Sequence, residues 1–532
     1  MGIYLNPGNK LFQIALNGKI FIDKSRLITE TNSLIDTPQR FLCVSRPRRF
    51  GKSMAADMLA AYYGRGTDSS PLFDNLQIAE DENYKKYLNQ YYVIKLNMQD
   101  FLSLSSDVTG LLELLQKKII RELQRELPDL PDPEETFLSM VLNDVYSMTG
   151  VPFIFIIDEW DCILREKKFP REQLNQYLDF LRNLLKDRVY VSLAYMTGIL
   201  PIKKYGTHSA LNMFSELSMI DAGDFAPYFG FTGEEVSALC EEYQVSYEEM
   251  AGWYDGYTIG KKDKKKGLPL HIYNPKSVVD SLRNGAFSSY WTRTETYEAL
   301  RVYIDMDFDG LRDAVKELLG GAEVPVNTEK FQNDMVSLHS RDDILTLLVH
   351  LGYLSYNFDD HTVHIPNREV RNEFYNAVDG SHWDELLASI QNSARLLEDT
   401  IAGNEKAVAK AIDYCHQQNI SAIRYNDENS LSCVITLAYY SAMNNYIRIR
   451  EMPAGKGFAD IVFIPRKGCT GPAMVVELKW DRSAETALRQ IHEKRYPDAL
   501  ADYSGNLLLV GISYDRESKE HSCVIEKLQK EA

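Results

Sequence analysis

Two acidic residues end an apolar run in the first third of the chain. Phe153 to Ile157 are apolar without interruption, and Asp158 and Glu159 follow directly. Such a run predicts a strand buried on both faces of a parallel sheet, and open α/β sheets place their chemistry at the carboxyl ends of such strands. Asp-Glu there is typical of a Walker B element, in which Asp158 binds Mg²⁺ and Glu159 polarises the attacking water. The alternative is an ordinary buried strand that ends in a solvated acidic turn.

A second group of residues suited to phosphate chemistry lies upstream. The string R-P-R-R-F-G-K-S spans Arg46 to Ser53, between an apolar stretch, Arg40 to Ser45, and the helical pattern M-A-A-D-M-L-A-A-Y-Y. A strand, a tight loop with Gly-Lys-Ser and a helix are the context of a P-loop. We expect the backbone around Gly51 to present N–H groups to phosphate oxygens and Lys52 to reach the β- and γ-phosphates. The Ser53 hydroxyl joins the Mg²⁺ shell in this interpretation.

The loop departs from the P-loop pattern at its first position. Arg46 stands where the pattern has glycine, and Pro47 biases Arg46 toward an extended conformation. The entry of the loop must therefore differ from the usual one, although the part from Gly51 onward can still form. A basic turn before an amphipathic helix is the alternative.

Further strands are predicted around these two motifs. Short strands are expected at Ile20–Asp23 and Tyr92–Asn97, and another at Val189–Thr197, which ends in a polar residue before a glycine. In ATPases of this architecture that last strand end carries a sensor side chain near the γ-phosphate, so Thr197 is the candidate for nucleotide contact. A threonine that merely caps the strand is the alternative. Alternating strands and helices predict a parallel α/β sheet of the P-loop kind.

The last third of the chain carries a different constellation. Glu477 and Lys479 lie two residues apart in a predicted strand, Ala473–Trp480, and therefore share a face of it. Asp460, in a predicted strand at Phe458–Ile464, lies on that face if the two strands pair. Two carboxylates with the Leu478 carbonyl form a hard oxygen site for Mg²⁺, and the lysine orients or deprotonates water for attack on a phosphodiester. Surface ion pairing is the alternative.

This D…E-x-K arrangement resembles that of the PD-(D/E)XK nuclease superfamily. In that superfamily the preceding helix often supplies a further acid, which the resemblance assigns to Glu428 as an additional metal ligand. Gln490 matches a helix residue of many members, Tyr496 matches less well, and Glu451 matches an acid of the family. The resemblance covers about Asp427 to Ile525.

The first half of the chain resembles a second family. Phe21 to Ser25, the R-P-R-R-F-G-K-S string, F-I-I-D-E-W-D and M-T-G-I-L-P-I-K-K together resemble the bacterial AAA-ATPase-like family, from Gly8 to about Asp280. Members commonly carry a C-terminal nuclease-superfamily domain. The resemblance implies ATP binding at Lys52, Ser53 and Asp158, with Glu159 as the hydrolytic residue.

Length, charge and cysteine content limit the expected number of domains, the partners and the cellular location. The 532 residues suffice for two to four domains, and the net charge of −17 provides no global attraction to nucleic acid or to anionic membranes. No apolar run is long enough to span a bilayer, and the start of the chain lacks a secretory signal pattern. Seven scattered cysteines without C-x-x-C favour a cytoplasmic protein. The basic run Lys261–Lys266 predicts a solvated hairpin tip, or alternatively a phosphate-contacting patch.

These observations predict three parts. We expect an AAA-like P-loop ATPase domain at 8–225, a helical lid or connector at 226–395 and an α/β restriction-endonuclease-like domain at 396–532. ATP and Mg²⁺ are the expected cofactors, and nucleic acid is the expected partner, with no membrane; a homo-oligomer or a partner protein is also open. The expected activities are ATP hydrolysis and Mg²⁺-dependent nucleic-acid cleavage. The alternative is a non-cleaving nucleotide-dependent switch whose C-terminal domain binds nucleic acid or a partner protein.

Overall fold

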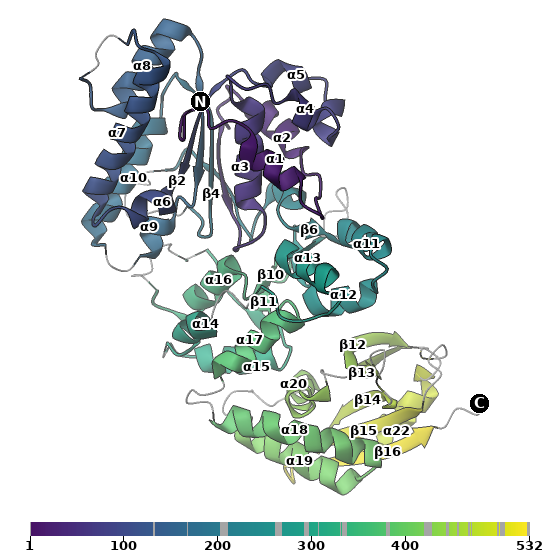
Figure 1. Ribbon diagram of the computed structural model, residues 1–532. Coiled ribbons are helices and arrows are strands. Elements are labelled where there is room, and N and C mark those ends of the chain that lie inside the picture. The colour runs from purple at the N-terminus through teal and green to yellow at the C-terminus, as the bar shows by residue number, and fades with distance from the viewer. Residues whose placement is uncertain are drawn as a thin grey trace. The chain divides into compact units, whose positions relative to one another are not determined.

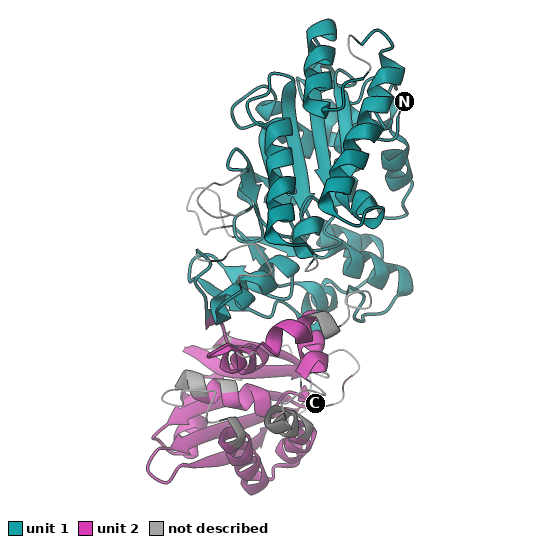
Figure 2. Cartoon of the chain, turned by 90° about the vertical axis from the view of Figure 1, so that its left-hand side faces the viewer, with its two compact units in different colours: residues 1–294, 325–369 teal, residues 295–324, 370–532 magenta. Residues whose placement is uncertain are grey.

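The structure, a computed structural model, describes every residue except 1, 131–133, 167–168, 203–210, 261–268, 292–296, 307, 330, 332–337, 379–383, 420–427, 443–445, 455–456, 466–468, 470, 497–499, 501–505 and 529–532. The chain divides into two units (Figure 2). The first comprises Met1–Thr294 and Pro325–Glu369, and the second comprises Glu295–Val324 and Val370–Ala532. The three-part division expected from the sequence stays a prediction.

A five-stranded parallel sheet organises the first unit (Figure 1). Its strands lie in the order β2-β3-β4-β1-β5, and all neighbours are parallel. The apolar run before Asp158 is β3, and all its residues are buried, as expected for a strand covered on both faces. Because β4 lies between β1 and β3, the carboxyl end of β1, which leads into the Gly-Lys-Ser loop, lies on one side of the end of β4. The carboxyl end of β3, which carries Asp158, lies on the other side. The bounds are β1 (Phe41–Ser45), β2 (Tyr92–Asn97), β3 (Phe153–Asp158), β4 (Val191–Gly198) and β5 (Ser215–Leu217).

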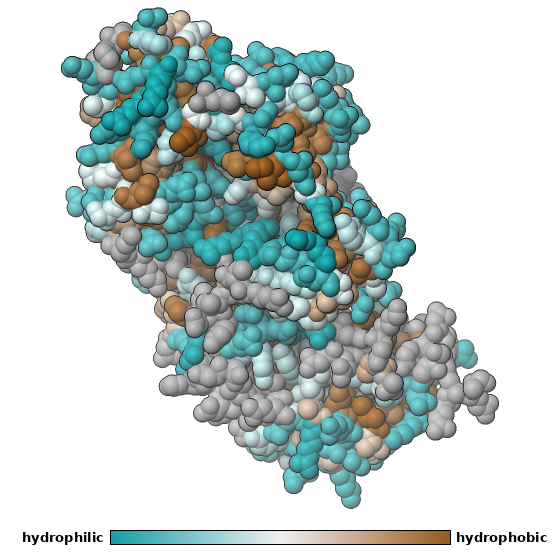
Figure 3. All heavy atoms as spheres, viewed as in Figure 1, coloured by the Kyte–Doolittle hydropathy of each residue, from teal (hydrophilic) through white to brown (hydrophobic). Residues whose placement is uncertain are grey.

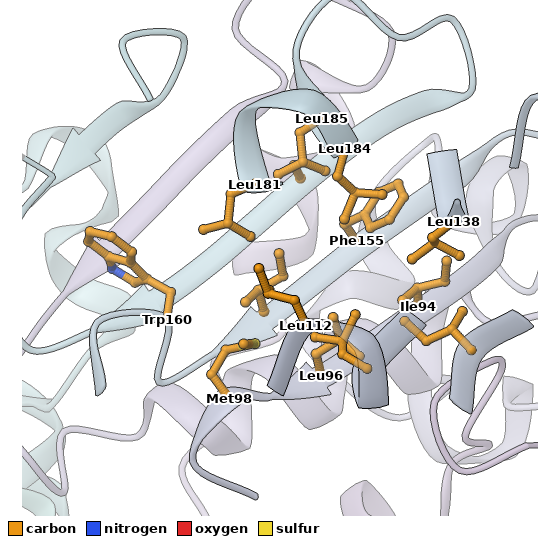
Figure 4. Close-up of a cluster of buried hydrophobic side chains, with 14 of the residues drawn as sticks. Ile94, Leu96, Met98, Leu112, Leu138, Phe155, Trp160, Leu181, Leu184 and Leu185 are labelled. Atoms are coloured by element: carbon orange, nitrogen blue, oxygen red, sulfur yellow. The ribbon is translucent and has the colours of Figure 1, made fainter. Parts of the chain in front are cut away.

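Alternate side chains of β3 enter two separate hydrophobic cores. Phe153, Phe155 and Ile157 belong to the core on one face, while Ile154 and Ile156 belong to the core on the other. Figure 4 shows the first core, in which Phe155 lies with leucines of three covering helices. Those helices are α7 (Val108–Glu126), α8 (Leu138–Thr149) and α10 (Arg171–Leu185), and the opposite face is covered by α1 (Lys10–Leu16), α2 (Leu27–Leu34) and α3 (Lys52–Tyr63).

Helix α1 carries apolar side chains on both its outer and its inner side. Apolar side chains gather on the surface over α1 (Figure 3), where Leu11 and Ile14 are both exposed. The inner side of the same helix contributes the buried Phe12 to the second core.

Short elements complete the α/β part of the first unit. They are α4 (Ser70–Phe73), η1 (Gln77–Glu80), α5 (Tyr84–Tyr87), α6 (Met98–Ser103), α9 (Cys162–Arg165) and η2 (Gly223–Tyr228).

Two strand predictions in this part need correction. The expected strand at Ile20–Asp23 is wrong, because this segment forms no strand. Its isoleucines pack against the helices of the next region, so the apolar alternation serves packing and not strand pairing. The strand expected from Val189 begins only at Val191, since Val189 is 73% exposed in the turn before it.

The region after Thr232 contains the expected helices together with unexpected strands. Strands β6, β8 and β7 form a small antiparallel sheet, and β10 pairs with β11 as a hairpin. Strands of two to four residues give too little alternation to be recognised in the sequence. The Lys261–Lys266 run lies outside the described residues. The bounds are β6 (Phe231–Thr232), α11 (Gly233–Glu242), α12 (Tyr247–Tyr254), β7 (Tyr257–Ile259), β8 (Leu270–Tyr273), α13 (Pro275–Asn284), β9 (Val324–Pro325), α16 (Arg341–Leu351), β10 (Ser355–Asn357) and β11 (Thr362–His364).

A five-stranded mixed sheet organises the second unit. Its order is β12-β13-β14-β15-β16, and only the β14–β15 pair is parallel. The last two strands were not predicted from the sequence. The segment from Asp384 to Asn419 forms two helices, because Gly403 adopts a left-handed conformation with φ of 87° and ends the first. The bounds are α14 (Tyr297–Ile304), α15 (Leu311–Leu319), α17 (Arg368–Val378), α18 (Asp384–Ala402), α19 (Glu405–Asn419), α20 (Glu428–Ala438), β12 (Tyr446–Ala454), β13 (Gly457–Pro465), β14 (Ala473–Trp480), α22 (Ala484–Glu493), β15 (Leu507–Asp515) and β16 (Glu520–Leu528).

Helices cover both faces of this second sheet. Val462 joins a core with Ile491 of α22, whereas its neighbour Phe463 packs against Tyr439, just after α20, with ring centroids 5.6 Å apart. Gly511 of β15 permits the close approach of α22, because a Cβ there would lie 2.4 Å from a backbone oxygen of that helix. The face that carries Glu477 therefore lies under α22.

Candidate functional site

The loop after β1 joins the sheet to α3 in the manner of a P-loop. Gly51 is the N-cap of α3 and has a φ of 88°, a left-handed conformation that glycine adopts without strain. No described side chain caps the first turn of α3. Its free N–H groups and the positive end of the helix are what an anion requires.

Arg46, at the position where a glycine was expected, is fully buried. Its Nη1 donates to the carbonyl oxygens of Ser45 at 3.0 Å and of Leu217 at 2.9 Å, and its backbone N–H donates to the Gly198 carbonyl oxygen at 3.1 Å. Burial lowers the pKa of the guanidinium to about 10. Arg46 thus ties the ends of β1, β4 and β5 together, which is a role that the sequence pattern does not reveal.

Lys52 is folded back onto the loop that precedes it. Its Nζ donates to the carbonyl oxygens of Arg46 at 2.8 Å and of Pro47 at 2.9 Å, and the side chain is buried. Burial lowers the pKa of this amine, while the carboxylates of Glu159 and Asp158 act in the opposite direction. The ammonium group therefore faces the acidic end of β3.

The acidic end of β3 brings together Asp158 and Thr197. Both side chains are buried, and the Thr197 hydroxyl donates to Asp158 Oδ1, which also accepts from the Glu159 N–H at 3.0 Å. These bonds fix the orientation of the carboxylate that was predicted to bind Mg²⁺.

Glu159 does not extend freely from this strand end. It has a φ of 53°, and its carboxylate forms an ion pair with Arg165 of α9. Arg165 also pairs at 3.2 Å with the wholly buried Asp161, which accepts the N–H groups of Ile199 and Leu200. Sequence reasoning missed Arg165 and Asp161, although Asp161 closes the F-I-I-D-E-W-D string and so stood beside the predicted pair.

A cavity of about 550 Å³ opens in front of the loop, a size that suits a small-molecule ligand. Gly51, Lys52, Ser53 and Glu159 are among the residues that line it. The remaining wall is mostly apolar, which suits the base and ribose of a nucleotide. That wall includes Phe12, Ile20, Phe21, Ile22, Met54, Met58, Tyr228, Phe231 and Val279.

The second constellation assembles on β13 and β14. Asp460 Oδ2 accepts the Leu478 N–H at 2.7 Å, just beyond the Ile461–Val476 pair at the end of the β13–β14 ladder. Lys479 Nζ donates to Glu477 Oε1 at 3.0 Å and to the Leu478 carbonyl oxygen at 2.8 Å. Gln490 of α22 also donates to Glu477 Oε1. The tertiary structure thus brings together Asp460, Glu477 and Lys479.

Glu477 is electrostatically unusual. Its side chain is 1% exposed, and burial, followed by the nearby charge of Asp460, raises its pKa to about 7, although Lys479 partly opposes this. Its Oε2 has no hydrogen-bond partner among the described residues. A buried carboxylate oxygen without a partner, beside a second carboxylate, fits a hard divalent cation.

The remaining metal ligand predicted for this domain is Glu428. Glu428 is the first residue of α20, but its side chain lies outside the described part of the structure. The described residues contain no group of three or more His, Cys, Asp or Glu side chains able to hold a metal ion. The described ligand set therefore consists of Asp460 and Glu477.

Comparison with known proteins agrees with this geometry. Residues 9–207 match the family model described as a predicted AAA-ATPase, and residues 426–523 match that of the PD-(D/E)XK nuclease superfamily. The chain joins an AAA-ATPase-like domain to a PD-(D/E)XK nuclease superfamily domain. Both resemblances inferred from the sequence are thereby confirmed. The fold class, a P-loop NTPase sheet followed by helices and a C-terminal α/β domain, is confirmed as well.

Individual relatives are distant. A protein of Azotobacter chroococcum mcd 1, described as an uncharacterised protein in the vnfD 5′ region, is 22% identical over 505 residues, covering 90% of each chain. The Walker-type ATPase paby2304 of Pyrococcus abyssi is 15% identical with a TM-score of 0.33, over 66% of this chain and 94% of that one. The ORC2 protein of Aeropyrum pernix, solved in ADPNP-ADP complexes, is 12% identical with a TM-score of 0.28, over 70% and 92%.

The predicted residues divide between the two domains. Gly51 to Ser53, Asp158, Glu159 and Thr197 lie in the AAA-ATPase-like domain, and Glu428, Asp460, Glu477 and Lys479 lie in the nuclease-superfamily domain. None of the helices formed by described residues combines the length and apolar character needed to cross a membrane.

Proposed function

We propose that the chain binds and hydrolyses ATP in its AAA-ATPase-like domain and cleaves nucleic acid with Mg²⁺ in its nuclease-superfamily domain. The observation that carries the proposal is the convergence of Lys479 and Gln490 on Glu477, with Asp460 on the adjacent strand. A lysine held against a buried carboxylate is costly as a structural device alone, because both charges lose their hydration. Phosphodiester chemistry gives this arrangement a use.

In the ATPase-like domain, each residue has a separate role. The N–H groups from Gly51 onward and the Lys52 ammonium bind phosphate oxygens, for which Lys52 must leave the loop carbonyls that it contacts here. Ser53 and Asp158 would hold Mg²⁺, which when bound offsets phosphate charge. Thr197 keeps Asp158 oriented. Glu159 orients the attacking water.

In the nuclease-superfamily domain, Asp460 and Glu477 would hold Mg²⁺, which when bound polarises the scissile phosphodiester. Gln490 keeps Glu477 in position, because it donates to the oxygen that also accepts from Lys479. Lys479 holds the attacking water near the phosphorus atom and lowers the free-energy cost of deprotonating that water. Glu428, which begins the neighbouring α20, remains a proposed additional ligand.

The test uses the full chain, labelled single- and double-stranded DNA and RNA, and Mg²⁺ or Mn²⁺, with and without ATP. Wild type is expected to cleave. Lys479→Ala is expected to lose cleavage but to remain folded, as shown by a cooperative thermal unfolding transition. Lys52→Ala is expected to lose ATP binding in calorimetry. ATP-dependent cleavage in wild type that disappears in Lys52→Ala would establish coupling between the two domains. Unchanged cleavage by Lys479→Ala, or unchanged ATP affinity of Lys52→Ala, would refute the respective assignment.

A second candidate function is the non-cleaving switch, which the net charge of −17 specifically favours. An acidic protein lacks the broad positive field that holds many nucleases on their substrates. In that case the C-terminal domain binds nucleic acid or a partner protein according to nucleotide state. Absence of cleavage in every condition, with association that depends on ATP, selects this function.

A further inference from the structure

Arg165 of α9 connects two carboxylates that follow β3. Its Nη2 pairs with Glu159 Oε2, and its Nε lies 3.2 Å from Asp161 Oδ2. The guanidinium group presents its nitrogens in a rigid planar fork, whereas a lysine ammonium is a point charge on a flexible stem. Arg165 therefore fixes the Glu159 carboxylate relative to Asp161.

Asp161 is itself held by the end of β4. Its side chain is wholly buried, and its Oδ2 accepts the N–H groups of Ile199 at 3.1 Å and of Leu200 at 2.8 Å. The backbone N–H of Trp160 donates to the Thr197 carbonyl oxygen at 3.0 Å, so a further bond joins the same two segments. Asp161 is thus bound to the strand end that carries the predicted nucleotide contact.

The same strand end orients both acidic residues of the site. Thr197 donates to Asp158 directly. Glu159 is reached through Asp161 and Arg165. The Glu159 backbone is fixed as well, because it has a φ of 53° and its N–H donates to Asp158 Oδ1 at 3.0 Å. A left-handed conformation at a residue other than glycine persists where the surrounding contacts determine it. The backbone and the carboxylate of Glu159 are therefore both held in place.

Stabilising the buried Asp161 does not account for both contacts of Arg165. One nitrogen of a cation suffices to stabilise a wholly buried carboxylate. Glu159 lines the cavity and its side chain is 24% exposed, so water can solvate its charge. Ion pairs of solvated groups contribute little to stability. The contact with Glu159 is therefore not required by burial, and its consequence is the orientation of a carboxylate in the cavity.

We propose that Arg165 is a positioning residue for ATP hydrolysis, which holds Glu159 in the orientation in which its carboxylate binds the attacking water. The ion pair engages Oε2, and Oε1 is the oxygen that accepts a hydrogen bond from water. Because Arg165 is fixed through Asp161 to the end of β4, this orientation depends on the position of that strand end. A carboxylate already held in its reactive orientation needs no reorganisation when water attacks. The inference rests on the proposed ATPase function and adds the element that controls its hydrolytic residue.

The test is a double-mutant cycle on the rate of ATP hydrolysis. Full-length wild type, Arg165→Gln, Glu159→Gln and the double variant are compared in single turnovers with radiolabelled ATP, followed for hours so that slow hydrolysis is measured. Arg165→Gln is expected to lower the rate about 10- to 100-fold, with an ATP affinity in calorimetry within about twofold of wild type. In the Glu159→Gln background the same substitution should have no effect, because it acts only through the carboxylate.

Two further variants separate positioning from folding. Arg165→Lys keeps a cation beside Asp161 and is expected to recover part of the rate. It takes the place of Arg165→Gln in the cycle if the latter lacks a cooperative unfolding transition. Arg26→Gln is the matched control, since it removes another arginine–glutamate pair of the same unit, with Glu80 at 3.0 Å. It is expected to leave the rate unchanged.

An equal loss from Arg165→Gln in the wild-type and Glu159→Gln backgrounds overturns the inference, as does an unchanged or increased rate in Arg165→Gln. A loss of ATP affinity that accounts for the lower rate, or an equal loss in Arg26→Gln, overturns it too. If wild type binds ATP without hydrolysing it, the proposed hydrolysis fails and this inference fails with it. If wild type hydrolyses ATP and the cycle is additive, the ATPase stands and only the positioning role of Arg165 is wrong.

Discussion

Replacing Glu477 by glutamine should change how stability depends on pH. The buried carboxyl of Glu477 has its pKa raised from 4.5 to about 7, by burial first and by Asp460 second. Glutamine has nearly the same shape and can still accept from Lys479 and Gln490 through its carbonyl oxygen. The substitution therefore removes a titrating group while the packing of β14 against α22 is retained.

The sign follows from proton linkage. The folded state binds the Glu477 proton more strongly than the unfolded state, so this contribution to stability is fully present below pH 4.5 and is lost as pH rises through 7. A pKa difference of this size corresponds to about 3 kcal/mol. In EDTA, the free energy of unfolding of the Glu477→Gln variant should therefore rise relative to wild type by about 3 kcal/mol between pH 4.5 and 8.

The assay is urea denaturation of both proteins across this pH range, followed by tryptophan fluorescence, to which Trp480 of β14 contributes. Mg²⁺ added at pH 8 should stabilise wild type more than the variant, because binding to the folded state recovers the cost of the ionised carboxylate. Parallel stability profiles of the two proteins from pH 5 to pH 8 would refute the reasoning.

Three further predictions concern the AAA-ATPase-like domain. Arg165→Ala leaves the wholly buried Asp161 without its cation and should lower the free energy of unfolding by about 3 kcal/mol, measured in urea against Arg165→Lys. Gly198→Ala should cost about 1–3 kcal/mol in the same assay, because the new methyl group would lie 2.7 Å from Trp160 Nε1. Gly51→Ala meets no atom within 4 Å, so only its left-handed backbone is strained, by about 1–2 kcal/mol, and Gly51→Asn should recover part of this loss in thermal melting.

Much of the architecture could be predicted because its signals are local. Strands β2, β3 and β14 begin and end within a residue or so of their expected bounds, since continuous apolar runs between polar residues reflect burial that each segment experiences directly. The Gly51 turn was recognisable because its signal, Gly-Lys-Ser between a strand and a helix, is also local. Short strands such as β6 and β7, and the misassigned Ile20–Asp23 segment, carry too few residues for periodicity to separate pairing from packing.

The motifs also determined which residues could do chemistry. Lys52, Asp158, Glu477 and Lys479 were selected by type and spacing alone, and the side-chain directions on a strand placed Glu477 and Lys479 on one face. Neither conclusion required knowledge of distant parts of the chain.

Only the tertiary structure decided what each of these residues contacts. Arg46 ties strand ends together, Arg165 holds Glu159, and Gln490 reaches Glu477. These partners come from separate elements, and no spacing along the chain encodes them. The physical reason is that apolar patterning depends on the local average of burial, whereas a hydrogen bond or an ion pair depends on how a helix such as α22 packs across the sheet.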